Sequence, residues 1–136
     1  AGIIVEIGSN VDKFNVGDKV THCMNLGSYS KFMKLKQDRV IKLKKEVDLK
    51  IAAASTLQGL TSQYLVNDSF NLKEQHTVLI HAAAGGVGQI LCQWAKKIGA
   101  KIIGTVSTKD KEDIAKKMDV VIQLIIPKKI LLKQYA

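Results

Sequence analysis

Residues 77–88, with the sequence TVLIHAAAGGVG, predict a short buried strand that runs through a glycine-rich turn into a helix. After the turn, apolar side chains recur at helical spacing, at Val87, Ile90, Leu91, Trp94, Ala95 and Ile98. Gly99 is expected to end the helix, and residues 100–106 predict a second, parallel strand. This order is a βαβ unit with glycines at its first turn, as the binding of a dinucleotide pyrophosphate requires.

Two glycines of the turn have separate expected roles. A Cβ atom at Gly85 would collide with an approaching phosphate, and a Cβ atom at Gly88 would keep the helix from packing closely on the strand. The free N–H groups and the positive dipole end of the helix would face the anion. The first glycine of the usual G-x-G-x-x-G fingerprint is replaced by Ala83, so a parallel α/β domain without a nucleotide is the alternative interpretation.

The chain before this unit predicts a different architecture. A strand is expected over residues 2–8, residues 16–20 predict a turn that leads into a second strand, residues 27–33 open a third, and residues 39–43 form a short fourth. A helix is expected from Asp48 to Leu65, and residues 71–75 form a polar connector. We therefore expect a mixed α/β chain with a β-rich part over residues 1–50, a linking helix and connector over residues 51–76, and a nucleotide-binding part over residues 77–136. The last range has room for only about half of a six-stranded doubly wound sheet, so both ends of the chain are expected to be cut.

Composition disfavours several other functions. The net charge of +9 comes almost entirely from lysines, and Arg39 is the only arginine, so the bidentate fork that suits nucleic-acid recognition is nearly missing. Cys23 and Cys92 form no C-x-x-C pair, and His22 beside Cys23 is too small a set for structural zinc, so no metal is expected. No apolar run is long enough to cross a membrane, and we expect a cytoplasmic protein without membrane insertion.

Four segments together resemble the zinc-independent quinone oxidoreductases of the medium-chain dehydrogenase/reductase superfamily, the zeta-crystallin-like branch. The matching segments are residues 1–20, 27–33, 58–65 and 78–108, and the stretch from His81 to Trp94 is specific to this branch. The resemblance implies part of a GroES-like β-barrel followed by the first half of a doubly wound Rossmann domain. It also implies hydride transfer from NADPH to a quinone or enone bound in the cleft between the two domains.

The resemblance assigns residues to the cofactor. Thr61 matches a position beside the nicotinamide, and Ser107 and Lys111 match positions around the adenosine 2′-phosphate. The pyrophosphate turn corresponds to Ala84, Gly85, Gly86, Val87 and Gly88. In this family Ala83 is the normal variant of the first glycine. No residue is assigned as catalytic.

The residues themselves support a preference for NADPH. A site for NAD wants an acidic residue about 20 positions past the turn, at the end of the second strand. That place is taken by Ser107, followed by Lys109 and Lys111, which suit a phosphate dianion. The alternative interpretation is the solvated first turn of the next helix, because residues 109–113 are a mixed-charge run.

Three functional hypotheses follow. The leading one is an NADPH-dependent quinone reductase in truncated or degraded form, which alone is not expected to turn over quinone. The second is a non-catalytic nucleotide-binding or sheet-pairing module, and the third and weakest is a basic single-strand nucleic-acid binder. The family's homodimer contact belongs to a C-terminal half that does not match this chain. Leu124, just after the expected third strand, takes the place of an aromatic residue on the adenine, and residues 125–136 have no family counterpart.

Overall fold

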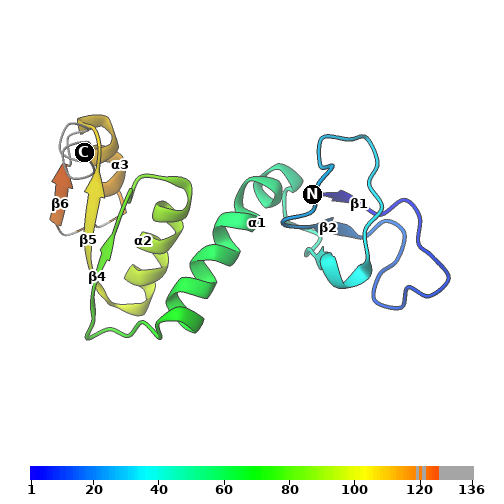
Figure 1. Cartoon of the computed structure of the whole chain (residues 1–136), viewed down its shortest axis with the longest axis horizontal. Helices are drawn as coiled ribbons and strands as arrows, with labels where there is room; N and C mark the ends of the chain where they lie inside the picture. The colour runs from blue at the N-terminus through cyan, green and yellow to red at the C-terminus, as the bar shows by residue number, and fades with distance from the viewer. Residues whose placement is uncertain (119, 121, 126–136) are drawn as a thin grey trace, which may run out of the picture. The chain divides into compact units, whose positions relative to one another are not determined.

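The computed structural model describes residues 1–118, 120 and 122–125 (Figure 1). The chain divides into an N-terminal unit, residues 1–57, and a C-terminal unit, residues 58–136. The boundary falls within helix α1 (Leu49–Gln63), so the linking helix contributes to both units. Asp48 starts this helix, because its Oδ1 atom accepts hydrogen bonds from the N–H groups of Lys50 (2.8 Å) and Ile51 (3.1 Å).

The N-terminal unit holds a small antiparallel sheet in the order β1-β2-β3. Its strands are β1 (Gly2–Ile3), β2 (Lys19–Thr21) and β3 (Ile41–Lys42), and the 3₁₀ helix η1 (Gln37–Arg39) precedes β3. Three residues of this fully described unit are buried, namely Phe14, Thr21 and Ala52. The Thr21 hydroxyl bonds to the Thr56 hydroxyl at 2.9 Å, which ties β2 to the first half of α1.

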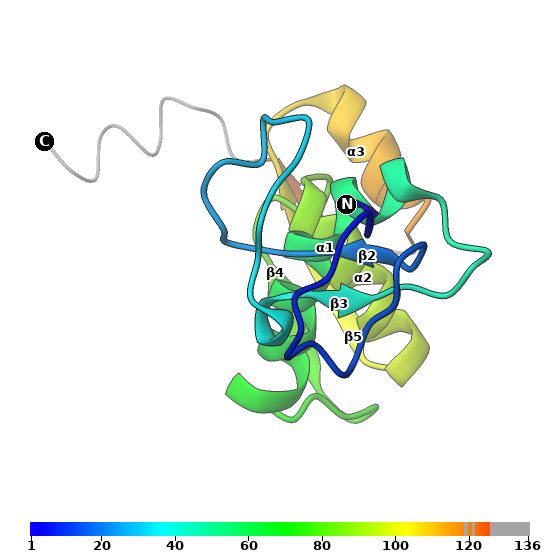
Figure 2. The same ribbon diagram turned by 90° about the vertical axis from the view of Figure 1, so that its right-hand side faces the viewer.

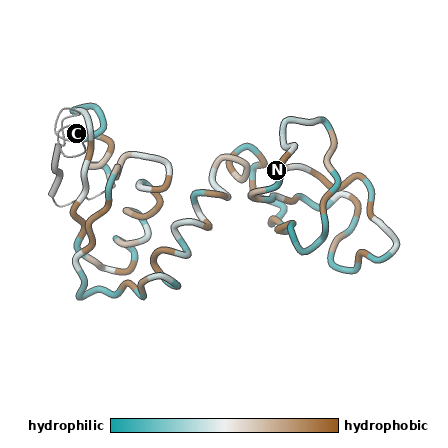
Figure 3. Tube along the Cα trace, in the orientation of Figure 1, coloured by the Kyte–Doolittle hydropathy of each residue, from teal (hydrophilic) through white to brown (hydrophobic). Residues whose placement is uncertain are grey.

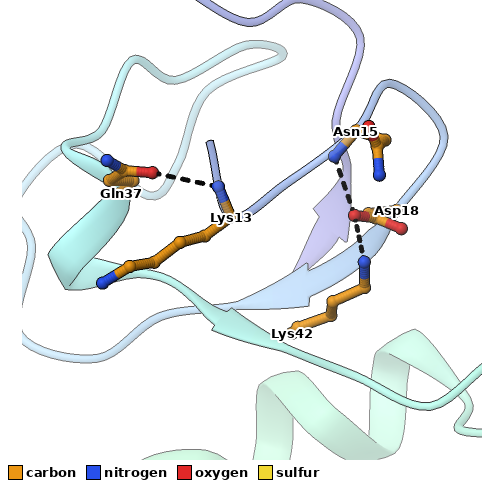
Figure 4. A network of polar contacts seen from close by, with 5 residues as sticks. All are labelled: Lys13, Asn15, Asp18, Gln37 and Lys42. Carbon is orange, nitrogen blue, oxygen red and sulfur yellow. Dashed lines mark hydrogen bonds and ion pairs between the residues drawn. The ribbon is translucent and has the colours of Figure 1, made fainter. Parts of the chain in front are cut away.

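A network around Asp18 holds the loop before β2 against β3 (Figure 4). The Asp18 carboxylate accepts a hydrogen bond from Lys42 Nζ at 2.6 Å and another from the N–H of Asn15 at 2.9 Å. The hydrogen bond from Lys42, followed by that from Asn15, lowers the pKa of Asp18. On the other side of the loop, the N–H of Lys13 donates to Gln37 Oε1 at 3.4 Å.

The turn over residues 16–20 and the strand after it are present as β2, but β1 and β3 are shorter than expected, and the strand expected from residues 27–33 is wrong. Gly27 has a φ of +94°, a left-handed conformation that ends an extended run. The hydroxyls of Ser28 and Ser30 donate to backbone carbonyls of the same loop, three residues back in each case. Such local bonds compete with sheet pairing. The segment bends at residues 29–31 instead of forming a strand, and the Tyr29 and Phe32 side chains are exposed.

The C-terminal unit contains the βαβ unit predicted from the glycine turn (Figures 1 and 2). Its order is β4 (Thr77–Ile80), α2 (Gly86–Ile98), β5 (Lys101–Val106), α3 (Lys109–Lys116) and β6 (Ile122–Ile125). The three strands form a parallel sheet in the order β4-β5-β6, with Val78 opposite Ile102 and Gly104 opposite Gln123. A π-helix, η2 (Tyr64–Ser69), continues α1 toward the connector. Leu124 therefore lies within β6 rather than after it, which corrects the expectation, and residues 126–136 lie outside the described part.

One face of this sheet carries the core of the unit. Helix α2 packs on β4 and β5, and α3 packs on β5 and β6. Ile102 and Val106 lie on the same face of β5, because side chains alternate along a strand. They belong to one buried cluster with the small residues Cys92 and Ala95 of α2. Figure 3 shows the hydrophobic segments of β4, β5 and α2 that supply this core. On the other face Leu79 is 52% exposed.

Of the apolar residues at helical spacing in α2, Ala95 is buried, and the larger ones, from Val87 to Ile98, are half-buried. Small side chains lie closest to the sheet because they let the helix approach it. Within the described residues, the helices are too short or too polar to cross a membrane.

Candidate functional site

The turn after β4 folds back on itself before α2 begins. Ala82 adopts a left-handed conformation with a φ of +51°, which non-glycine residues rarely do. The carbonyl of Ala82 accepts a hydrogen bond from the N–H of Gly85 at 2.7 Å. This reversal places Gly85 as the extended N-cap residue of α2. The glycine turn expected from the sequence is therefore present, and its shape depends on an unfavourable backbone angle.

Gly88 allows the helix to approach the turn very closely. A Cβ atom built on Gly88 would lie 2.3 Å from the carbonyl oxygen of Ala82 and 2.8 Å from Cα of Ala83. No side chain fits at such distances. The sequence analysis expected close packing at Gly88, and the structure places the contact on the turn backbone rather than on the strand.

The first turn of α2 offers unused hydrogen-bond donors. The N–H groups at the start of a helix have no carbonyl four residues earlier. The N-cap residue Gly85 makes no side-chain cap, and the first turn contains no acidic residue that could neutralise the positive dipole end. The carbonyl of Ala84 is occupied by Gln89 Nε2 at 2.9 Å. Free N–H donors at Gly86 and Val87 beside engaged carbonyls suit a phosphate group, so the residues present fit a dinucleotide pyrophosphate.

Thr105 of β5 holds the turn in this shape. Its hydroxyl oxygen accepts a hydrogen bond from the N–H of Ala82 at 3.2 Å and lies 3.1 Å from His81 Nδ1. Its carbonyl accepts a hydrogen bond from the N–H of Ala83 at 3.0 Å. Thr105 is only 5% exposed. Sequence reasoning missed this residue, although a hydroxyl inside an otherwise apolar strand was a visible signal.

Gly104 makes room for the turn on β5. A Cβ atom at this position would lie 2.9 Å from Cβ of Ala83 and 2.7 Å from Cγ1 of Val120. The turn and the chain before β6 therefore converge on the one residue of β5 that has no side chain.

Ser107 and Lys111, the two residues expected around a 2′-phosphate, lie together after β5. Lys111 Nζ donates to the Ser107 hydroxyl at 3.3 Å, and the N–H of Lys111 donates to the Thr108 hydroxyl, which caps α3. Because β4 and β5 are parallel, Ser107 and the glycine turn follow strand ends at the same edge of the sheet. Glu112 is engaged by Lys116 at 2.8 Å.

Helix α1 also reaches the glycine turn. A Cβ atom built on Gly86 would lie 3.4 Å from Cγ of Gln58 and 3.6 Å from its Nε2 atom. Thr61, the residue expected beside the nicotinamide, is half-buried and follows Gln58 by three residues, so both lie on one face of α1. Sequence reasoning named Thr61 and missed Gln58.

Among the described residues, no metal-ligating side chains are grouped at this edge. Burial raises the pKa of the Cys92 thiol to about 11, and its Sγ atom lies 4.0 Å from the carbonyl of Ala83, so Cys92 is a protonated packing residue. His22 Nδ1 lies 3.3 Å from the Asn25 amide. Among residues 1–118, 120 and 122–125, no three His, Cys, Asp or Glu side chains are grouped to hold a metal ion. The absence of zinc stays a prediction.

Comparison with known proteins finds several quinone oxidoreductases and a 2-haloacrylate reductase among the relatives of this chain. No family model matches the chain. The chain is 44% identical to a quinone oxidoreductase of Pseudomonas aeruginosa over 117 residues. These residues make up 85% of this chain and 36% of that protein. It is 41% identical over 121 residues to a 2-haloacrylate reductase of a Burkholderia species, which is 87% of this chain and 36% of that protein.

A solved structure agrees with these relatives. The structure of an Escherichia coli quinone oxidoreductase complexed with NADPH matches with a TM-score of 0.89 and 39% identity, over 98% of this chain and 41% of that chain. The mixed α/β fold expected from the sequence, a piece of a GroES-like domain followed by a piece of a Rossmann domain, is thereby confirmed. The chain spans little more than a third of the length of the curated relatives that it matches.

Proposed function

This chain is a homologue of quinone oxidoreductases of the medium-chain dehydrogenase/reductase superfamily, and from that premise we propose that it carries the cofactor-binding turn of an NADPH-dependent reductase of quinones or enones. The observation that carries the proposal is the start of α2. There the N–H donors are uncapped, the neighbouring carbonyls are engaged, and Gly88 touches the turn backbone.

The proposal gives each residue a role in binding. The turn from Ala84 to Gly88 binds the pyrophosphate through the N–H groups at the start of α2. Ser107 and Lys111 bind the adenosine 2′-phosphate, since their side chains lie 3.3 Å apart with a hydroxyl and an ammonium directed at one place. Thr61 lies beside the nicotinamide. When bound, NADPH supplies the hydride that is transferred to the quinone or enone.

Binding and turnover are tested separately. The chain is titrated calorimetrically with NADPH and with NADH, and a quinone is then added while the cofactor absorbance is followed. We expect NADPH to bind more tightly than NADH. An acidic residue that would bind the ribose 2′-hydroxyl of NADH is missing, because Ser107 stands at that position. The absence of binding to either nucleotide would defeat the proposal.

We expect no useful turnover of quinone by this chain alone. Hydride transfer needs donor and acceptor in a near-attack geometry, where a misplacement of about 1 Å costs about a hundredfold in rate. The acceptor-side part of the relatives' longer chain does not match this chain, which spans about 36% of their length. Steady quinone-dependent oxidation of NADPH would show instead that the chain is sufficient for the reaction. Binding without turnover would agree with the second hypothesis, a non-catalytic nucleotide-binding module. Measuring quinone reduction by a chain as long as the relatives then distinguishes the two hypotheses.

A further inference from the structure

The side chain of Gln58 lies directly over the first residue of α2. Three of its atoms surround the place where Gly86 would carry a Cβ atom, with Cγ at 3.4 Å, Nε2 at 3.6 Å and Cδ at 4.0 Å. Gln58 belongs to the same unit as the turn, so this contact is internal to the C-terminal unit. The Gln58 side chain therefore packs against Gly86, the first residue of α2.

The Gln58 amide has no hydrogen-bond partner in the described part of the chain. The one bond recorded for this residue runs to its backbone carbonyl, from the Ser62 hydroxyl at 2.8 Å. Among the described residues, no hydrogen bond joins this amide to the start of α2, although its Nε2 atom lies 3.6 Å from the place of a Cβ atom on Gly86. No buried side-chain nitrogen or oxygen among the described residues lacks a partner, so the unpaired amide is open to solvent and to a ligand.

We propose that Gln58 is a further binding residue of the cofactor site, whose amide N–H donates a hydrogen bond to the pyrophosphate held at the start of α2. The inference rests on the proposed function, because it needs a dinucleotide in the turn. The Gln58 amide N–H and the N–H groups at the start of α2 can both donate to one pyrophosphate oxygen, because charged oxygens accept several hydrogen bonds. Gln58 acts on the part of the cofactor that NADPH and NADH share, whereas Lys111 acts on the 2′-phosphate.

A charge series at position 58 tests the inference. Gln58→Glu places a carboxylate beside the pyrophosphate and is expected to weaken NADPH binding about tenfold, and Gln58→Lys is expected to tighten it several-fold. Gln58→Ala removes the donor alone and should weaken binding about fivefold. The matched controls are Gln75→Glu and Gln75→Lys, because Gln75 is exposed and precedes β4, at the far end of the strand from the turn.

Calorimetric titration with NADPH and NADH is the readout, after circular dichroism and a thermal melt have shown that each variant folds like the parent. We expect the Gln58 variants to change both affinities by the same factor, with opposite signs for Glu and Lys, and the Gln75 variants to change neither by more than about twofold. Equal effects at positions 58 and 75 would mean that only net charge matters and would overturn the inference. Unchanged binding in Gln58→Glu and Gln58→Ala would overturn it as well. A parent chain that binds neither nucleotide would instead defeat the proposed function itself.

Discussion

Replacing Gly88 by alanine tests how tightly the helix is pressed on the glycine turn. The new Cβ atom would lie 2.3 Å from the carbonyl oxygen of Ala82, whereas ordinary contact begins near 3.4 Å, so helix and turn must separate by about 1 Å. Overpacking of this kind costs about 3 kcal/mol, and the better helix propensity of alanine returns about 1 kcal/mol. We therefore expect the free energy of unfolding to fall by about 2 kcal/mol and Tm to fall by about 10 °C.

Gly59 provides the matched control. It lies within α1, and a Cβ atom there would meet nothing within 4 Å, so Gly59→Ala should raise the free energy of unfolding by about 1 kcal/mol. Urea unfolding followed by circular dichroism measures both variants, and titration with NADPH then shows whether the displaced turn still binds. If Gly88→Ala were as stable as Gly59→Ala, the close contact between α2 and the turn would not exist in solution.

Three further predictions concern the same unit. Thr105→Val removes the hydroxyl that accepts a hydrogen bond from the N–H of Ala82 and should weaken NADPH binding about tenfold. Thr105→Ser keeps the hydroxyl and should bind NADPH like the parent chain, so an equal loss in both variants would contradict a role for the hydroxyl. Lys111→Ala should weaken NADPH more than NADH in the same titration, because only NADPH carries the 2′-phosphate near Ser107; equal losses would reduce Lys111 to surface charge. At pH 8 a thiol-alkylating reagent should modify the partly exposed Cys23 and spare Cys92. Burial raises the pKa of Cys92 to about 11, so its modification should begin only as the pH rises toward that value. Mass spectrometry measures both sites, and rapid labelling of Cys92 at pH 8 in the folded chain would refute its burial.

The amino-acid sequence by itself determined the βαβ unit. Helical periodicity after the glycine turn predicted a helix over residues 87–98, and the structure has α2 over Gly86–Ile98. Gly99, with a φ of +91°, ends that helix as expected. The sequence also placed Ser107 and Lys111 after the second strand, where the structure brings them together. These features are local, because a turn, a helix and its two ends are specified by residues that are close in the chain.

The β-rich first part was predicted less well for the opposite reason. Its strands depend on pairing between distant segments, as in the register of Gly2 with Val20 and of Val20 with Lys42. The residues of a segment do not reveal whether a partner strand is available, so a strand was expected from residues 27–33 although the chain bends there.

Only the tertiary structure decided how the glycine turn is held. Thr105 lies more than twenty residues from Ala82 in the chain, and Gln58 lies still farther from Gly86. Their roles arise because parallel strands place β5 beside β4 and because α1 lies against the start of α2, and no local pattern encodes either neighbour. The sequence predicts which backbone turn could bind a phosphate, and the side chains that lie against that turn are known only from the folded chain.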